Sequence, residues 1–148
     1  MTPIPESICR FLDANHVLSL AVGDADGSLW AASCFYVFDE TSGRLIVMSS
    51  ASTLHGRMML VRPDVAGTIA GQPAQVADIR GVQFRAHACR LTEDAGREAA
   101  FACYAQRHPM ARQIPADVWS LSLQQLKFTD NQVAFGHKTL WQRDDEGA

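Results

Sequence analysis

Hydrophobic and polar residues alternate with a period of two along much of the chain, which is the pattern of β-strands that bury one face. In the first such stretch, Leu18, Leu20 and Val22 share one side, and smaller or polar residues share the other. The alternation predicts strands at residues 17–23, 29–38, 45–49, 65–71, 79–91 and 119–128. We expect a bulge at Gly81 in the fifth strand and a bend at Gln124–Gln125 in the sixth.

Three shorter stretches repeat apolar residues every three or four positions, which is typical of helices with one buried side. The first begins at Thr2-Pro3, the second follows a Ser/Thr cluster at 49–53 and stops at Arg62-Pro63, and the third runs from Thr92 to Arg107. The predicted buried faces are Ile8, Phe11 and Leu12 in the first, Leu54, Met58 and Val61 in the second, and Ala95, Ala99, Ala102 and Cys103 in the third.

The loops between most strands are short, which favours antiparallel pairing and therefore a barrel or a curled sheet. The helices are not spaced as crossovers between parallel strands, and this excludes a doubly wound fold. We expect a mainly β fold with short helices that close its ends. All 148 residues form a single domain in this interpretation, with a frayed tail at about 144–148.

Composition narrows the class of protein. Hydrophobic residues make up 47% of the chain and charged residues 20%, as in ordinary globular proteins. The net charge is −3 and no basic stripe occurs, so we expect no nucleic-acid partner. No apolar run approaches the roughly 20 residues of a membrane span, and the N-terminus does not resemble a secretory signal. We therefore expect a cytoplasmic protein without a membrane partner.

Residues that could carry catalysis or bind metal are scattered. The four cysteines, Cys9, Cys34, Cys89 and Cys103, form no CxxC pair, which indicates reduced and mostly buried thiols. The five histidines lack the spacing of metal ligands, and no nucleophile elbow, P-loop or GxGxxG motif occurs. We expect no metal site, and no residue stands out as a catalytic acid, base or nucleophile.

The segment Ser49–Arg57 is more informative because hydroxyl groups precede a predicted helix start and two basic side chains follow. Ser49, Ser50 and Thr53 could donate hydrogen bonds to an anion, and His55 and Arg57 could add positive charge. Backbone amides at a helix N-terminus attract phosphate groups in the same way. The alternative is that Ser52 or Thr53 simply caps the helix.

The end of the chain is a second candidate site. Trp141 lies in a basic segment with Lys138 and Arg143. A tryptophan beside a cation can present a flat face to a planar ligand, or it can close the hydrophobic core.

Together these features resemble the flavin-binding split-barrel superfamily related to pyridoxamine 5′-phosphate oxidase, and more closely a family of small uncharacterised bacterial proteins within it. The resemblance covers nearly the whole chain. It rests on the order of elements and on the stretches WAASCFYVF (30–38), VAGTIAGQP (65–73), IRGVQF (79–84), KFTDN (127–131) and FGHKTLWQR (135–143). It implies a six- to seven-stranded antiparallel split β-barrel of the Greek-key type.

The resemblance also implies a homodimer with flavin mononucleotide (FMN) at the subunit interface. The backbone around Ser33, Cys34 and Phe35 would run along the flavin ring. The phosphate would lie beside Ser49, Ser50, Thr53, His55 and Arg57, and Trp141 with Arg143 would lie on the far side of the cofactor.

Some positions depart from the oxidase pattern. The oxidase has Ser-Arg-Lys at the phosphate, whereas this chain has Thr53-Leu54-His55, so a titratable histidine replaces a fixed cation. Its Arg-Gln-Val-Arg stretch becomes Arg80-Gly81-Val82-Gln83. Each lost charge-assisted hydrogen bond is worth about 1.5–3 kcal/mol. We therefore expect weaker flavin binding than in the oxidase, and no oxidation of pyridoxamine phosphate.

The sequence thus favours an FMN-binding protein, with flavin-dependent oxidoreductase activity on an unknown small substrate. One alternative is a dimeric split-barrel protein without catalysis that binds another ligand, such as heme. Another is a structural dimer that binds a partner protein.

Overall fold

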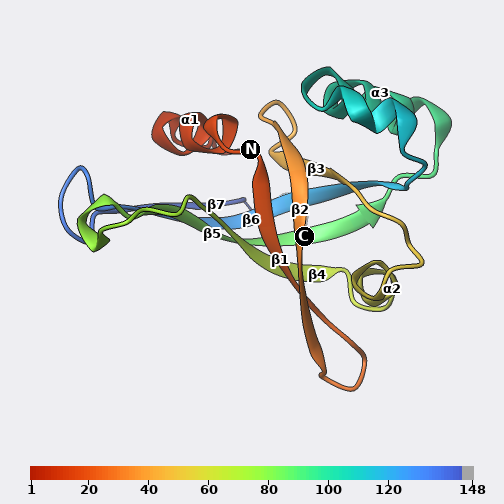
Figure 1. Cartoon of the computed structure of the whole chain (residues 1–148), viewed down its shortest axis with the longest axis horizontal. Coiled ribbons are helices and arrows are strands. Elements are labelled where there is room, and N and C mark those ends of the chain that lie inside the picture. The colour runs from red at the N-terminus through yellow and green to blue at the C-terminus, as the bar shows by residue number, and fades with distance from the viewer. Residues whose placement is uncertain (145–148) are drawn as a thin grey trace.

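The structure is a computed structural model that describes residues 1–144, so the predicted frayed tail lies outside the described residues apart from Asp144. Figure 1 shows the arrangement of the elements. The helices and strands are α1 (Glu6–Ala14), β1 (Val17–Gly23), β2 (Leu29–Asp39), β3 (Arg44–Met48), α2 (Leu54–Val61), β4 (Asp64–Ala70), β5 (Arg80–Arg90), α3 (Asp94–Arg107), β6 (Val118–Asp130) and β7 (Lys138–Gln142), with 3-10 turns η1 (Val76–Asp78) and η2 (Pro109–Gln113).

The strands form a closed antiparallel barrel with one strand added outside the closure. The strand order is β3-β2-β1-β4-β5-β6-β7, and a further pairing of β3 with β6 closes a ring of six strands. The predicted mainly β antiparallel barrel with short helices is confirmed. The connection from β3 through α2 to β4 crosses from one edge of the β1–β2–β3 meander to the other, since β4 pairs with β1.

Strand β6 divides its pairing between two partners. Its first half, from Val118 to Ser122, pairs with β3, and its second half, from Gln125 to Thr129, pairs with β7. The register against β5 shifts at Gln124, which has no partner in that ladder. The predicted bend at Gln124–Gln125 is therefore confirmed as a β-bulge that lets one strand serve both the barrel and β7.

The bulge predicted at Gly81 is wrong. Gly81 pairs in continuous register with Ala70 on β4 and Thr129 on β6. A Cβ atom at Gly81 would lie 3.3 Å from both the Ala70 side chain and the Ile69 carbonyl oxygen. The glycine therefore accommodates a close neighbouring strand, not an extra residue.

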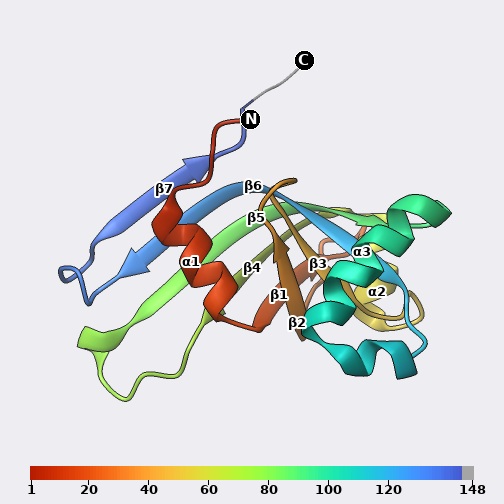
Figure 2. The same ribbon diagram turned by 90° about the horizontal axis from the view of Figure 1, so that it is seen from above.

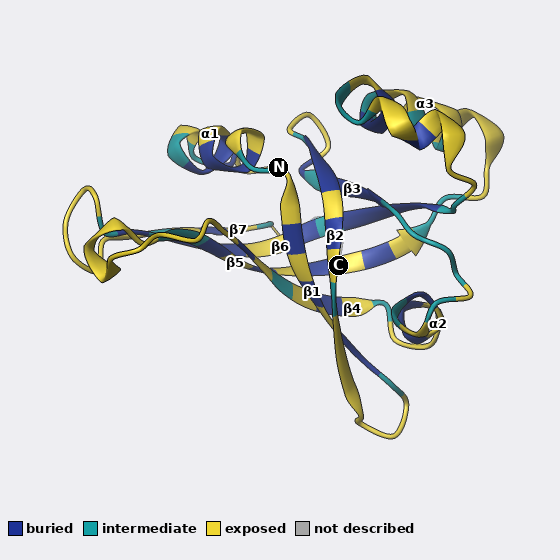
Figure 3. Ribbon diagram, viewed as in Figure 1, coloured by how far each residue is buried: buried dark blue, intermediate teal, exposed yellow. Residues whose placement is uncertain are grey.

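Two hydrophobic clusters lie on opposite faces of the barrel wall. Figure 3 shows buried and exposed residues alternating along several of the strands. The larger cluster fills the barrel, and α1 closes it with Ile8, Phe11 and Leu12, as predicted. The smaller cluster lies outside, where α3 packs Tyr104 and two alanines with outward side chains of the wall, namely Val37 of β2, Ile46 of β3 and Val118 of β6. In both Figure 1 and Figure 2, β1–β3 lie between α1 and α3.

The helix starts differ from the sequence prediction at the first and third helices. Helix α1 begins at Glu6 with Pro5 as its N-cap, because Thr2 instead bonds to the Asp144 carboxylate through its amide and hydroxyl groups. Helix α3 has Glu93, not Thr92, at its N-cap.

The predicted buried faces of the other two helices are wrong in part. In α2, Met58 is buried as expected, but Leu54 and Val61 are exposed and Met59 is buried instead. In α3 the buried stripe is Ala100, Tyr104 and Ala105, and the predicted Ala95, Ala99 and Ala102 are exposed. Helix α2 packs Met58 and Met59 into the larger cluster, whereas α3 packs on the outer face of the barrel wall. The position of the barrel therefore decides which side of each helix is buried, and periodicity alone does not.

The four cysteines are free thiols, of which Cys9 and Cys34 are buried, Cys103 is half-buried and Cys89 is exposed. Within residues 1–144, no group of three or more His, Cys, Asp or Glu side chains could hold a metal ion. None of the helices in this part of the chain is long and apolar enough to cross a membrane.

Candidate functional site

The loop from β3 to α2 brings together the polar residues predicted to bind phosphate. The Ser49 hydroxyl lies 2.6 Å from Nε2 of His55, and the Thr53 hydroxyl lies 3.4 Å from the same nitrogen. Ser50 lies in the same turn, where its hydroxyl is 2.7 Å from that of Ser52. Arg57 is exposed in the first turns of α2. The loop therefore offers several hydroxyls and an imidazole in one place.

Local hydrogen bonds explain the shape of this loop. Thr53 is the N-cap of α2, and its hydroxyl accepts a hydrogen bond from the Gly56 amide at 3.1 Å. The same hydroxyl donates to the Ser50 carbonyl at 2.7 Å. A Cβ atom at Gly56 would lie 2.5 Å from that carbonyl oxygen, so a glycine lets the turn fold against the helix. The predicted capping role of Thr53 is therefore confirmed, and it coexists with the polar cluster.

Residues just before and within β6 hold the other side of the loop. The Ser49 amide donates to the Asp117 carbonyl at 3.0 Å, and the Ala51 amide donates to the Asp117 carboxylate at 2.8 Å. The Trp119 indole donates to the Ser49 carbonyl at 2.9 Å. Sequence reasoning missed Asp117 and Trp119, because nothing local links them to a loop more than sixty residues earlier.

The electrostatics of the loop depend on His55. Burial lowers the pKa of this half-buried imidazole below its ordinary value, so the ring is neutral at pH 7. The cluster therefore presents hydrogen-bonding groups without a fixed positive charge beside them.

The three predicted ring-contact residues on β2 point in alternate directions. Ser33 and Phe35 are exposed on the outer face, and Cys34 is buried in the barrel. Phe35 lines a cavity of about 380 Å³ between β2 and the segment from α3 through η2. Met48 and Ala116 also line it, and they directly precede Ser49 and Asp117. The cavity and the polar loop are thus neighbours.

Trp141 and Arg143 serve the core of their own chain. Trp141 is 5% exposed, and its indole donates to the Thr2 carbonyl at 2.9 Å. Arg143 donates to the carbonyls of Leu123 at 2.7 Å and Gly43 at 2.8 Å, and its guanidinium lies over the Trp141 ring. β7 and α2 lie toward opposite ends of the molecule in Figures 1 and 2, so one chain does not bring these residues to the phosphate loop.

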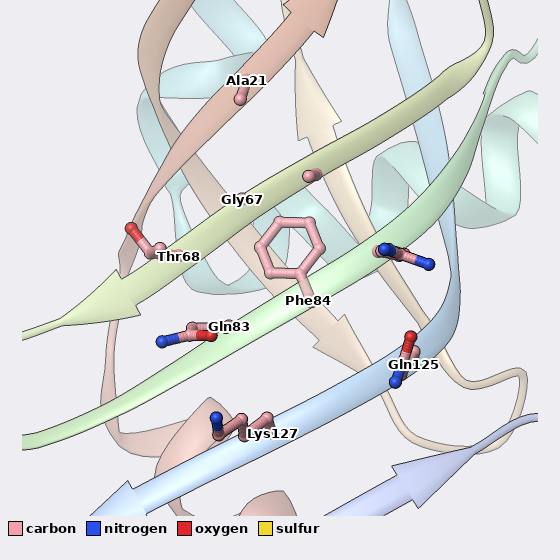
Figure 4. Close-up of a pocket in the computed structure, with 9 residues that line it drawn as sticks. Ala21, Gly67, Thr68, Gln83, Phe84, Gln125 and Lys127 are labelled. Carbon is pink, nitrogen blue, oxygen red and sulfur yellow. The ribbon is translucent and has the colours of Figure 1, made fainter.

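A second cavity, of about 450 Å³, lies on the outer face of β1, β4, β5 and β6 (Figure 4). Gln83, Gln125 and Lys127 line it, and the Phe84 ring lies beside Gly67. A Cβ atom at Gly67 would lie 2.4 Å from the Phe84 ring. None of the predicted site residues lines this cavity.

Comparison with known proteins places the chain in a bacterial family. A UPF0306 protein of Haemophilus ducreyi is 42% identical over 147 residues, which cover 99% of this chain and 100% of the relative. The chain belongs to the UPF0306 family. A UPF0306 protein of Serratia proteamaculans is 46% identical over 138 residues, which cover 93% of this chain and 94% of the relative. No family model matches the chain.

Solved structures share the fold of this UPF0306 chain at low sequence identity. A heme-binding protein from Mycobacterium smegmatis has a TM-score of 0.75 at 19% identity, with 96% of this chain and 60% of the other covered. The heme storage protein HutZ from Vibrio cholerae has a TM-score of 0.71 at 20% identity, with 84% and 94% covered. An FAD-binding protein from Mesorhizobium loti has a TM-score of 0.67 at 15% identity, with 83% and 92% covered.

Proposed function

We propose that this UPF0306 protein binds FMN and acts as a flavin-dependent oxidoreductase on a small substrate. The observation that carries the proposal is the cluster of Ser49, Thr53 and His55 at the start of α2, adjacent to a cavity that Phe35 lines. A phosphate at the loop and a planar ring along the outer face of β2 would match the ends of one flavin nucleotide.

The donor set of the loop suits a phosphate monoester. The hydroxyls of Ser49 and Ser50 can donate to phosphate oxygens, and the Thr53 hydroxyl could do so by giving up its bond to the Ser50 carbonyl. His55 adds a charge-assisted hydrogen bond when it is protonated. The nearby carboxylate of Asp117 already accepts a hydrogen bond from the Ala51 amide. When bound, FMN would supply the redox chemistry, and the protein would bind and orient it.

The proposal includes a homodimer with the cofactor at its interface. Large apolar side chains are exposed at the start of β2, where Leu29 is 80% and Trp30 is 51% exposed, and a second copy would cover them. Because Trp141 and Arg143 are distant from the loop of their own chain, they could flank the flavin only from the second copy.

The experiment is a titration of the desalted protein with FMN, followed by flavin fluorescence. We expect saturable quenching at one flavin per chain, and weaker binding of riboflavin, which lacks the phosphate. The absence of quenching at high protein concentration would contradict the proposal.

A heme-type ligand is the second candidate, because split-barrel structures with this fold include proteins described as heme-binding or heme storage. His87 is a candidate iron ligand on the exposed surface, since its Nδ1 lies 3.3 Å from an Asp64 carboxylate oxygen. Metal-binding imidazoles commonly pair their other ring nitrogen with a carboxylate in this way. A Soret band on adding hemin that is lost in His87→Ala would favour heme over FMN. A spectrum equal to that of free hemin would exclude it.

A further inference from the structure

We propose that the cavity between α3, η2 and the outer face of β2 binds a small planar aromatic molecule that carries a negatively charged group at one end. The cavity measures about 380 Å³, which is within the range of small-molecule sites. Its role as the substrate pocket rests on the proposed function, because the cavity adjoins the proposed flavin site through Phe35 and Met48.

The walls of the cavity are mostly apolar. Three large apolar side chains around it remain exposed, namely Phe35 at 56%, Met110 at 68% and Ile114 at 52%. Single exposed apolar residues are common, but three around one concave site indicate a surface that a ligand covers.

One wall is built of aromatic rings. The His108 ring centroid lies 5.4 Å from that of Phe35 and 4.9 Å from that of Tyr104. The Nε2 of His108 donates to the Tyr36 carbonyl at 2.9 Å, which fixes the orientation of the ring. Rings prefer to contact other rings at these separations, so this wall favours a flat, aromatic ligand.

Hydrogen-bond donors gather at the end of α3. Tyr104 is only 7% exposed, and its hydroxyl makes no hydrogen bond within residues 1–144. In the same part of the chain, every fully buried side-chain oxygen or nitrogen has a hydrogen-bond partner. The hydroxyl must therefore be part of the small accessible surface of Tyr104, which lines the cavity. Burial raises the pKa of Tyr104, so the hydroxyl stays protonated and can donate.

Arg107 supplies the positive charge. Its Nη2 contacts the Asp13 carbonyl and lies 3.0 Å from Nδ1 of His16, so the guanidinium is held at the edge of the cavity. No Asp or Glu side chain lines the cavity. A carboxylate or phenolate group of a ligand could therefore accept a hydrogen bond from Tyr104 and pair with Arg107, whereas a cationic ligand would find no carboxylate in the cavity.

The experiment uses 2-naphthoate and its uncharged analogue 2-naphthamide, with binding to the full-length protein measured by calorimetry. We expect saturable binding of naphthoate at one per chain, at least tenfold tighter than naphthamide. Met110→Asp should weaken naphthoate binding at least tenfold, because it places a carboxylate in the cavity. Leu140→Asp is the matched control on β7, since Leu140 is also 68% exposed.

Arg107→Gln should remove the preference for naphthoate while naphthamide still binds, and Arg107→Lys should restore the preference. Ile114→Asp serves if Met110→Asp does not fold. Absence of saturable binding, or equal losses in Met110→Asp and Leu140→Asp, would overturn the proposal. An FMN titration of the same samples separates the two proposals: naphthoate binding without FMN binding contradicts only the flavin, and the reverse result contradicts only the aromatic pocket.

Discussion

The Ser49 hydroxyl lies 2.6 Å from Nε2 of His55, across the turn that joins β3 to α2. Neither residue belongs to the hydrophobic core, and the pair adds little to the packing of the barrel. A short polar pair on an accessible loop can exchange its internal hydrogen bond for bonds to an anion at small cost. This exchange is the physical basis of the proposed phosphate site.

The double variant Thr53→Ala/His55→Ala tests the site directly. We expect FMN affinity to fall tenfold or more, because two groups that would contact the phosphate are removed. Fluorescence titration measures the change. Removal of the Thr53 cap also costs about 1 kcal/mol of stability, so the folded fraction is checked by circular dichroism.

Riboflavin is the control ligand for this variant, since it has no phosphate and its affinity should not change. Thr53→Ser/His55→Lys is the control protein, because it keeps a hydroxyl at position 53 and replaces the titratable histidine with a permanently charged lysine. Unchanged FMN affinity in the double alanine variant would mean that Thr53 and His55 do not bind the phosphate.

Stability should depend on pH through His55. Its pKa is lowered in the folded protein by burial, so below about 6.5 the unfolded chain binds the proton more readily than the folded one. The unfolding free energy should therefore decrease as the pH falls from 7.5 toward 5.5. Urea denaturation of the protein and of His55→Gln measures this, and the variant should show a shallower decrease. Parallel pH profiles would argue against a buried neutral imidazole.

Gly67 should not tolerate a side chain. A Cβ atom there would lie 2.4 Å from the Phe84 ring and 2.5 Å from the Ser19 carbonyl oxygen. We expect Gly67→Ala to lower the unfolding free energy by at least about 2 kcal/mol, as overpacking of a core does. Gly71→Ala is the control, because nothing lies within 4 Å of its added Cβ atom. Thermal denaturation compares the two, and equal midpoints would refute the steric argument.

The hydrogen bonds of Arg143 should stabilise the folded chain. Arg143→Ala removes donors from the Leu123 and Gly43 carbonyls, and we expect a loss of about 2 kcal/mol in unfolding free energy. Arg57→Ala, an exposed arginine on α2, should change it by less than about 0.5 kcal/mol. Urea denaturation measures both variants. Similar small effects would mean that the carbonyl contacts of Arg143 contribute little.

The proposed dimer can be tested at Trp30. Trp30 is 51% exposed near the β1–β2 turn, and a carboxylate there would be buried in the interface, so Trp30→Glu should convert a dimer into a monomer. Light scattering after gel filtration measures the mass. Phe135→Glu is the control, since Phe135 is 82% exposed in the turn between β6 and β7. A wild-type protein of single-chain mass would contradict the dimer.

The sequence by itself determined strands β1–β6 and the polar residues of the loop before α2. The alternation around Leu20 and Phe84 was unambiguous, because a strand in a barrel wall must bury one face and expose the other. The sequence also predicted a cap at Ser52 or Thr53, because a cap depends on residues within one turn of the helix, and the structure selects Thr53.

Only the tertiary structure decided what lies far apart in the chain. It put Asp117 against the Ser49 loop, Tyr104 and Arg107 beside Phe35, and Arg143 against Gly43. It also selected which sides of α2 and α3 are buried, since α2 packs into the core of the barrel and α3 packs on its outer face. Periodicity reflects the contacts of a residue with its neighbours in the chain. A binding site and the buried face of a helix depend instead on how the barrel closes, which no local pattern encodes.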